Sequence, residues 1–120
     1  MNLKNSFPKK NRLNNSLIIR EVFKQGAYKS LGPIGVKFRK TEIESSLFAI
    51  SVKKKVGDSP CRNRIKRLLR EAVRMEKSKL ICTFEICFFV MDSPRDKIEY
   101  PFVLGQVKKF FEYLNEEFCR

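Results

Sequence analysis

A chain of 120 residues with 42% hydrophobic composition is long enough for one compact domain with a real core and too short for two. The formal net charge of +13 indicates a polyanionic partner, and nucleic acid is favoured over a membrane because no apolar run reaches the ~18 residues that span a bilayer. Histidine is missing from the sequence, which excludes catalysis by a histidine acid, base or triad.

The N-terminal segment, residues 1–12, is basic and contains no acid. Pro8 disfavours an early helix, so we expect an extended basic arm. Its cations are Lys4, Lys9, Lys10 and Arg12. The segment has no apolar run of signal-peptide length, and we therefore expect a cytoplasmic protein.

The first predicted helix covers residues 17–25 and ends before Gly26, which is a good helix stop. Asn and Ser residues immediately before it offer N-caps. Core packing is the favoured role for Val22. Ile19 and Phe23 are four residues apart and can form one rim of a binding groove.

Strands are predicted in three further segments of the chain. Apolar residues alternate with Gly, Lys and Arg over residues 34–39, which is the period of a half-buried strand. A polar turn at residues 41–46 leads to a β-prone run from residue 47, and a hairpin is the simplest arrangement of these two strands. The nearly apolar run at residues 80–91 predicts a central strand, covered on much of both faces.

The most informative stretch is residues 59–74, which follow the cations Lys53, Lys54 and Lys55. Ser59 as N-cap and Pro60 at the first helical position predict a helix over residues 60–76, and it connects the last two strands in a βαβ unit. Its apolar residues form one stripe, which should face a core. The positions around the rest of the helix are almost all basic: Arg62, Asn63, Arg64, Lys66, Arg67, Arg70 and Arg74.

This basic helix face has two interpretations, a solvated surface or a nucleic-acid contact. Ordinary solvated helices mix Glu with Lys because unlike charges support one another at i,i+4 spacing. Residues 53–79 instead contain eleven Lys or Arg against three acids, and their mutual repulsion favours a polyanionic ligand. Arginine predominates on the helix, and its planar guanidinium suits phosphate oxygens and base edges. We therefore favour nucleic acid.

A closing helix is predicted after Pro101, because apolar residues repeat at helical spacing from Val103 to Phe118. Its outer positions carry Glu112, Glu116 and Glu117. Because the acids gather near the C-terminus and the cations lie before residue 80, one face of the protein should be basic and another roughly neutral.

Cysteine and carboxylate spacing predicts no metal site. None of the four cysteines, Cys61, Cys82, Cys87 and Cys119, forms a paired zinc motif, and free thiols in a reducing compartment are the favoured interpretation. Cys82 and Cys87 are five apart in the predicted strand and should point to opposite faces. The nearest pair of acids, Asp92 and Asp96, suits a loop better than a Mg2+ cage. The protein alone therefore looks like a binder.

Residues 47–57 followed by residues 62–71 resemble the signature of the bacterial ribonuclease P protein family. The most specific mark is Arg62-Asn63-Arg64 opening a basic helix after the strand end Ser-Val-Lys-Lys-Lys-Val-Gly. Weaker matches include Arg12-Leu13 and the run Val-Phe-Lys before Gly26.

The resemblance implies a subunit of the ribonucleoprotein endonuclease that removes the 5′ leader from precursor tRNA. In that family the RNA subunit and its Mg2+ ions carry out the hydrolysis, and the protein binds the catalytic RNA and the single-stranded leader. Catalytic and metal-binding side chains, a membrane and a small-molecule substrate are therefore not expected. The implied fold is a single-domain α+β sandwich with a mixed sheet of about four strands, three helices and a left-handed βαβ crossover, like domain 2 of ribosomal protein S5.

The resemblance also implies two groups of site residues. The first group would bind the catalytic RNA and comprises Lys53, Lys54, Lys55, Arg62, Asn63, Arg64, Lys66, Arg67 and Arg70. The second would line the leader groove and comprises Ile19, Phe23, Phe38, Lys10 and Arg12. An aromatic residue is common in the family at the position of Ile19, so only apolar contact is expected there. Asp92 stands where a basic residue is frequent, and that edge is not expected to touch RNA.

Two alternatives stand beside this interpretation. A basic ribosomal or RNA-chaperone protein would share the charge and the fold type, but it has no reason to combine the three lysines with the Arg-Asn-Arg motif. A self-sufficient protein nuclease is disfavoured because the sequence has neither histidine nor a carboxylate cluster.

Overall fold

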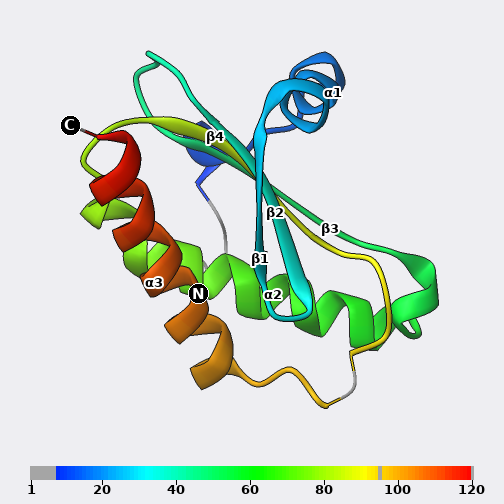
Figure 1. Ribbon diagram of the computed structural model, residues 1–120. Helices are drawn as coiled ribbons and strands as arrows, with labels where there is room; N and C mark the ends of the chain where they lie inside the picture. The colour runs from blue at the N-terminus through cyan, green and yellow to red at the C-terminus, as the bar shows by residue number, and fades with distance from the viewer. Residues whose placement is uncertain (1–7, 95, 120) are drawn as a thin grey trace.

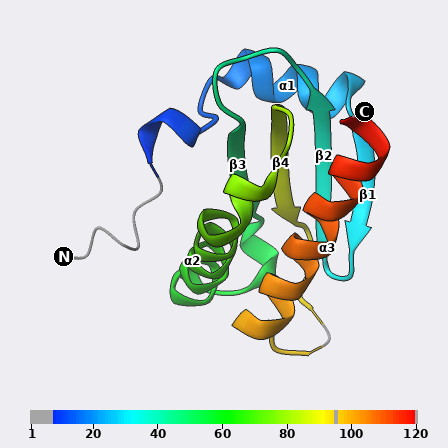
Figure 2. The same ribbon diagram turned by 90° about the vertical axis from the view of Figure 1, so that its left-hand side faces the viewer.

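The computed structural model describes residues 8–94 and 96–119, in which three α-helices pack on a four-stranded sheet (Figure 1). The helix α1 lies alone on one side of the sheet, and α2 and α3 cover the other side (Figures 1 and 2). The helices are α1 (Ser16–Gln25), α2 (Ser59–Glu76) and α3 (Tyr100–Phe118), and the strands are β1 (Ala27–Leu31), β2 (Ile34–Lys40), β3 (Leu47–Val52) and β4 (Phe84–Val90).

The strand order is β1-β2-β4-β3. The predicted hairpin between β2 and β3 is wrong, because β4 lies between them, antiparallel to β2 and parallel to β3. The hairpin instead joins β2 to β1, a strand that the alternation of apolar residues did not reveal because most of it is exposed at the sheet edge. Gly32 has a φ of +69° in the two-residue turn, and a glycine tolerates this conformation.

The predicted βαβ unit is confirmed as β3-α2-β4. In Figure 2 the chain runs down β3, returns upward through α2 in front of the sheet, and enters β4 on the right of β3. This arrangement is left-handed, as the family resemblance implied, and is an exception to the usual right-handed sense.

The main core lies between the sheet and the two helices α2 and α3. Alternation along β2 buries Ile34, Val36 and Phe38 on this side, and the predicted apolar stripes of α2 and α3 pack against them. The strand β4 is buried at six of its seven positions, which confirms its central place. The start of α2 differs from prediction in one detail, because Asp58 rather than Ser59 is the N-cap and accepts a 3.0 Å hydrogen bond from the N–H of Cys61.

The described part of the N-terminal arm is not extended throughout. Residues Lys9–Asn11 form a turn of 3-10 helix, and Arg12 then makes a β-bridge with Phe48. Asn11 is buried, and its side-chain amide donates a 2.9 Å hydrogen bond to the carbonyl of Ser46. This contact holds the segment beside β3. Residues 1–7 of the predicted arm, including Lys4, lie outside the described residues.

The prediction of free thiols is wrong for two of the four cysteines. Cys82 forms a disulfide with Cys119 across 37 residues, with their Cα atoms 5.7 Å apart. Cys82 lies in the turn before β4, next to the end of α3, and only the packing of these distant segments shows the proximity. Cys61 and Cys87 are free. Within the described residues, no helix has the length and apolar character needed to cross a membrane.

Candidate nucleic-acid interface

Helix α2 places its cations on the side opposite the core. Ile65 and Leu69 are buried against the sheet, whereas Asn63, Arg67 and Arg70 are exposed. We call the predicted set Lys53, Lys54, Lys55, Arg62, Asn63, Arg64, Lys66, Arg67 and Arg70 the basic helix face. All nine of these residues lie on α2 or on the turn that leads into it, and all are at least partly exposed.

Three members of the basic helix face already have protein partners. Arg64 pairs with Glu99 at 3.2 Å, and Lys55 pairs with Asp92 at 2.8 Å. Arg62 donates a 2.9 Å hydrogen bond to the hydroxyl of Ser59. The two ion pairs are exposed to solvent, which screens them, so a phosphate can compete for either cation.

The other cations of this face are uncompensated. Lys53, Lys54, Lys66, Arg67 and Arg70 form no ion pair with any residue in the described ranges 8–94 and 96–119. Further along α2, Arg74 pairs with Glu71, and this hydrogen-bonded contact raises the pKa of the Arg74 guanidinium. The free positive charge therefore lies on the first three turns of α2 and on the turn before it.

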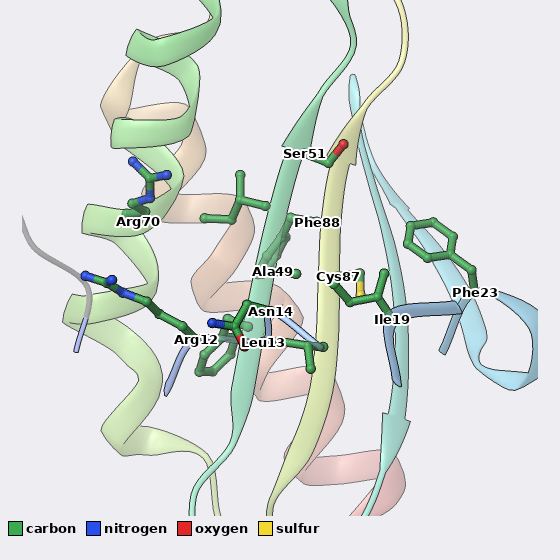
Figure 3. A pocket seen from close by; sticks show the side chains of 12 residues that line it. Arg12, Leu13, Asn14, Ile19, Phe23, Ala49, Ser51, Arg70, Cys87 and Phe88 are labelled. Carbon is green, nitrogen blue, oxygen red and sulfur yellow. The ribbon is translucent and has the colours of Figure 1, made fainter. Parts of the chain in front are cut away.

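A groove of about 550 Å3 runs between α1 and the two strands β3 and β4 (Figure 3). Its walls come from different parts of the chain. Ile19 and Phe23 project from α1 on one side, and Arg12 and Arg70 lie on the other side, beyond β3. The groove therefore combines an apolar and aromatic wall with a wall that carries two arginines.

The groove exists because the outer side of the sheet carries small residues at this point. Alternation along β3 turns Phe48 and Ile50 to the main core, and Ala49 and Ser51 to the opposite side. Cys87 of β4 lies next to Ala49 in the register and completes the floor. Burial raises the pKa of the Cys87 thiol to about 12, and the nearby Glu85 carboxylate adds to this effect, so the thiol stays protonated at neutral pH.

Two sets of contacts fix α1 above this floor. Val22 is fully buried and packs in a small cluster with Leu13 and Cys87. Arg39 of β2 bridges α1 to β4, with its guanidinium 2.6 Å from Glu85 and 3.2 Å from Glu21. The hydrogen bond to Glu85 is the main cause of the raised pKa of Arg39. The guanidinium of Arg39 compensates the charge of Glu85, so this buried carboxylate under α1 does not oppose an anionic ligand.

The structure places three of the five predicted groove residues in the groove: Ile19, Phe23 and Arg12. Phe38 is wrong. It lies on the helix-covered side of the sheet, is 1% exposed, and makes edge-to-face contacts with Phe110 and Phe118 at centroid distances of 5.3 and 5.4 Å. Strand alternation turns its neighbour Lys37 to the outer side instead. Lys10 lines a separate hollow beside Glu44 and Leu47.

Sequence reasoning missed the floor and one wall of the groove. Ala49 and Ser51 carry no distinctive chemistry, and only their alternation with Phe48 and Ile50 could have assigned them to the outer face. Arg70 was assigned only to the basic helix face. The structure shows that it also lines the groove, so the two surfaces meet at this residue (Figure 3).

Comparison with known proteins identifies the family of this chain. The sequence profile of the Ribonuclease P family matches residues 7–115. The chain belongs to the ribonuclease P protein family. The ribonuclease P protein component of Clostridium novyi is 32% identical over 91 residues, which cover 74% of this chain and 80% of that protein. The component of Fusobacterium nucleatum is 39% identical over 62 residues, and this match spans only 56% of that relative's length.

Solved ribonuclease P proteins share the fold. The protein from Thermotoga maritima superposes with a TM-score of 0.71 at 27% identity, covering 85% of this chain and 96% of that one. The protein from Staphylococcus aureus superposes with a TM-score of 0.74 at 23% identity, covering 86% and 94% of the two chains. The predicted fold class, a mixed four-stranded sheet with three helices, is confirmed.

Membership of the ribonuclease P family agrees with the chemistry of the site. The exposed cations of the basic helix face suit the RNA-binding role that follows from this family. Across residues 8–94 and 96–119, no three His, Cys, Asp or Glu side chains gather where they could hold a metal ion.

Proposed function

We propose that this chain is the protein subunit of a bacterial ribonuclease P, which removes the 5′ leader of precursor tRNA. In this proposal the basic helix face anchors the catalytic RNA, and the groove beside α1 holds the single-stranded leader. The partners are thus one structured RNA and one unpaired strand. The proposed activity belongs to the cytoplasm, and the Mg2+ ions it requires are held by the RNA subunit.

The observation that carries the proposal is the junction of two different surfaces at Arg70. A dense group of uncompensated cations suits the phosphates of a folded RNA, since phosphate contacts supply most of the affinity in such complexes. A groove with an aromatic wall and flanking arginines suits unpaired bases, which stack on flat side chains. Arg70 lies on both surfaces. An unpaired strand that leaves the groove at Arg70 would therefore lie next to the RNA bound to α2.

Cleavage of a precursor tRNA by a bacterial ribonuclease P RNA tests the proposal. The reaction is run at low Mg2+ with the RNA alone, with the protein alone, and with both. We expect 5′-leader removal to be stimulated only when both are present. Tight RNA binding without stimulation would contradict the proposal and favour a ribosomal or RNA-chaperone role, and cleavage by the protein alone would indicate a protein nuclease.

A further inference from the structure

The disulfide between Cys82 and Cys119 is an uncommon feature for a protein with a proposed cytoplasmic location. Thiols in that compartment are kept reduced, and the disulfides that do occur there are usually transient and serve catalysis or redox sensing. Cys82 and Cys119 are both partly exposed, whereas the free thiol of Cys87 is buried. A small thiol or disulfide in solution can therefore reach the bonded pair more readily than it can reach Cys87.

The side chain of Asn115 joins the same two segments without involving either sulfur atom. Its carbonyl oxygen accepts a 2.9 Å hydrogen bond from the N–H of Ile81, and its amide donates a 2.9 Å hydrogen bond to the carbonyl of Lys79. Asn115 lies one helical turn before Cys119, and Ile81 immediately precedes Cys82. Because neither hydrogen bond depends on the disulfide, both should keep the two thiols side by side after reduction.

Other contacts hold the end of α3 in place as well. The ring of Phe118 packs against Phe38 and Phe84 at centroid distances of 5.4 and 6.3 Å. Lys40 of β2 donates a 2.9 Å hydrogen bond to the backbone carbonyl of Phe118. Reduction of the disulfide should therefore loosen the end of α3 without releasing it. Two thiols held in this way have a high effective concentration toward each other, so the bond can form again.

The surroundings of Cys82 favour its reaction. Cys82 lines a hollow of about 210 Å3 together with Lys10 and Lys77. Nearby cations favour the thiolate form of a cysteine, and the thiolate is the form that attacks a disulfide. Cys82 is therefore suited to react first with a small disulfide that enters this hollow.

We propose that Cys82 and Cys119 form a reversible redox site, which low-molecular-weight thiols and disulfides such as glutathione open and close. In the closing reaction, the Cys82 thiolate attacks oxidised glutathione, forms a mixed disulfide and releases one glutathione thiolate. The Cys119 thiolate then attacks the Cys82 sulfur, forms the protein disulfide and releases the second glutathione thiolate. The two released thiolates take up the protons that the cysteines lost, and two electrons pass from the protein to oxidised glutathione.

The redox site is remote from the RNA-binding surfaces proposed above. The end of α3 lies on the opposite side of the molecule from the turn that leads into α2 (Figure 1). The state of the disulfide should therefore change the stability of the fold and leave the contacts with RNA as they are. The inference uses the proposed cytoplasmic location and no other part of the proposed function. Asn115 acts in it as a positioning residue.

Equilibration of the purified full-length protein with mixtures of reduced and oxidised glutathione tests this site. Mass spectrometry after an acid quench measures the fraction of closed disulfide, and peptide mapping identifies the cysteines. In the wild type, Cys82 and Cys119 should reach the same fraction from the reduced and from the oxidised protein. Asn115→Ala should lower the effective concentration of the two thiols about tenfold, because it removes both hydrogen bonds to the turn before β4.

Matched variants show whether the hydrogen bonds of Asn115 are responsible. Asn115→Asp keeps the acceptor for the N–H of Ile81 and should lose less than Asn115→Ala. Glu112→Ala is the control, because Glu112 is exposed on the same helix, and it should keep the wild-type value. Alanine is the best helix former, so a weaker α3 would not explain a loss in Asn115→Ala. Thermal unfolding of each reduced variant verifies that it is folded.

Three results would overturn the inference. The disulfide might form at no ratio of the two glutathione forms, or it might stay closed in a large excess of reduced glutathione, as a permanent structural bond would. Equal effective concentrations in the wild type and a folded Asn115→Ala would also contradict it. The titration contains no RNA, so its failure is distinct from failure of the proposed function, which is measured by cleavage of precursor tRNA.

Discussion

The two sides of the sheet use similar residues for different purposes. On the helix-covered side, Phe38, Phe84 and Phe88 are at most 1% exposed and pack against α2 and α3. On the outer side, α1 covers only part of the sheet, and Phe23 and Phe89 remain accessible beside small residues. The helix-covered side therefore forms the main core, whereas the outer side leaves open space and accessible aromatic surface beside α1.

The largest expected effect is a difference in stability between alanine variants of Phe38 and Phe23. Phe38→Ala should lower the free energy of unfolding by about 3–5 kcal/mol, because it leaves a cavity under α3. Phe23→Ala should cost much less stability, since that ring is already partly in water. Urea denaturation of both variants measures the difference. Equal losses of stability would contradict the division between the two sides.

The disulfide offers a second way to test the helix-covered side. Cys82 and Cys119 tie the end of α3 to the turn before β4, so reduction should lower the free energy of unfolding by about 2–4 kcal/mol. Thermal unfolding with and without a reductant measures this, with the Cys82→Ser, Cys119→Ser double variant as a control that should not respond. RNA affinity below the unfolding temperature should be unchanged. A parallel loss of RNA affinity would mean that the two sides are coupled.

The salt dependence of RNA affinity should differ between variants that lose an unpaired cation of α2 and variants that lose a paired one. Arg67→Ala should lower the slope of log affinity for the catalytic RNA against log salt by about 0.9, as expected for one lost phosphate contact. Arg64→Ala should reduce the slope less, because Glu99 already competes for Arg64. Lys109→Ala on the exposed surface of α3 is the control. An unchanged slope in Arg67→Ala would argue against this face as the anchor.

The smallest expected effect concerns the groove floor. The Cys87 thiol has a pKa of about 12 in the folded protein, against an ordinary 9.0. Its contribution to the free energy of unfolding is therefore complete below pH 9 and should disappear as pH rises toward 12. At neutral pH the Cys87 thiol is protonated and buried, whereas Cys61 is partly exposed. Iodoacetamide should therefore react with Cys61 before Cys87. Peptide mapping after limited alkylation measures the order. Preferential reaction at Cys87 would show that the floor is more open than the structure indicates.

Local signals made α2, α3 and the central strand predictable from the sequence. Pro60 and the apolar stripe located the basic helix to within one residue, and the lack of alternating polar residues marked β4 as central. Such features depend on neighbours within a few positions. The family resemblance supplied the strand number, the crossover sense and the division into two surfaces.

Features that depend on distant segments could not be predicted in the same way. The β2–β3 hairpin was predicted wrongly because β4 pairs between these two strands. The Cys82–Cys119 disulfide could not be predicted because it depends on where α3 packs. Phe38 is a different error, because its alternation with Lys37 was visible. It was assigned to the groove even though its own pattern placed it with the core residues Ile34 and Val36.

The central claim is that anchoring and leader binding use two different surfaces, which meet at Arg70. The ratio of precursor to mature tRNA affinity tests this claim most directly. The ratio is measured for wild-type, Phe23→Ala and Arg67→Ala proteins, each saturated with catalytic RNA. Phe23→Ala should weaken precursor tRNA about tenfold and leave mature tRNA unchanged, whereas Arg67→Ala should preserve the ratio. Equal losses for both tRNAs in Phe23→Ala, or a lower ratio in Arg67→Ala, would contradict the account.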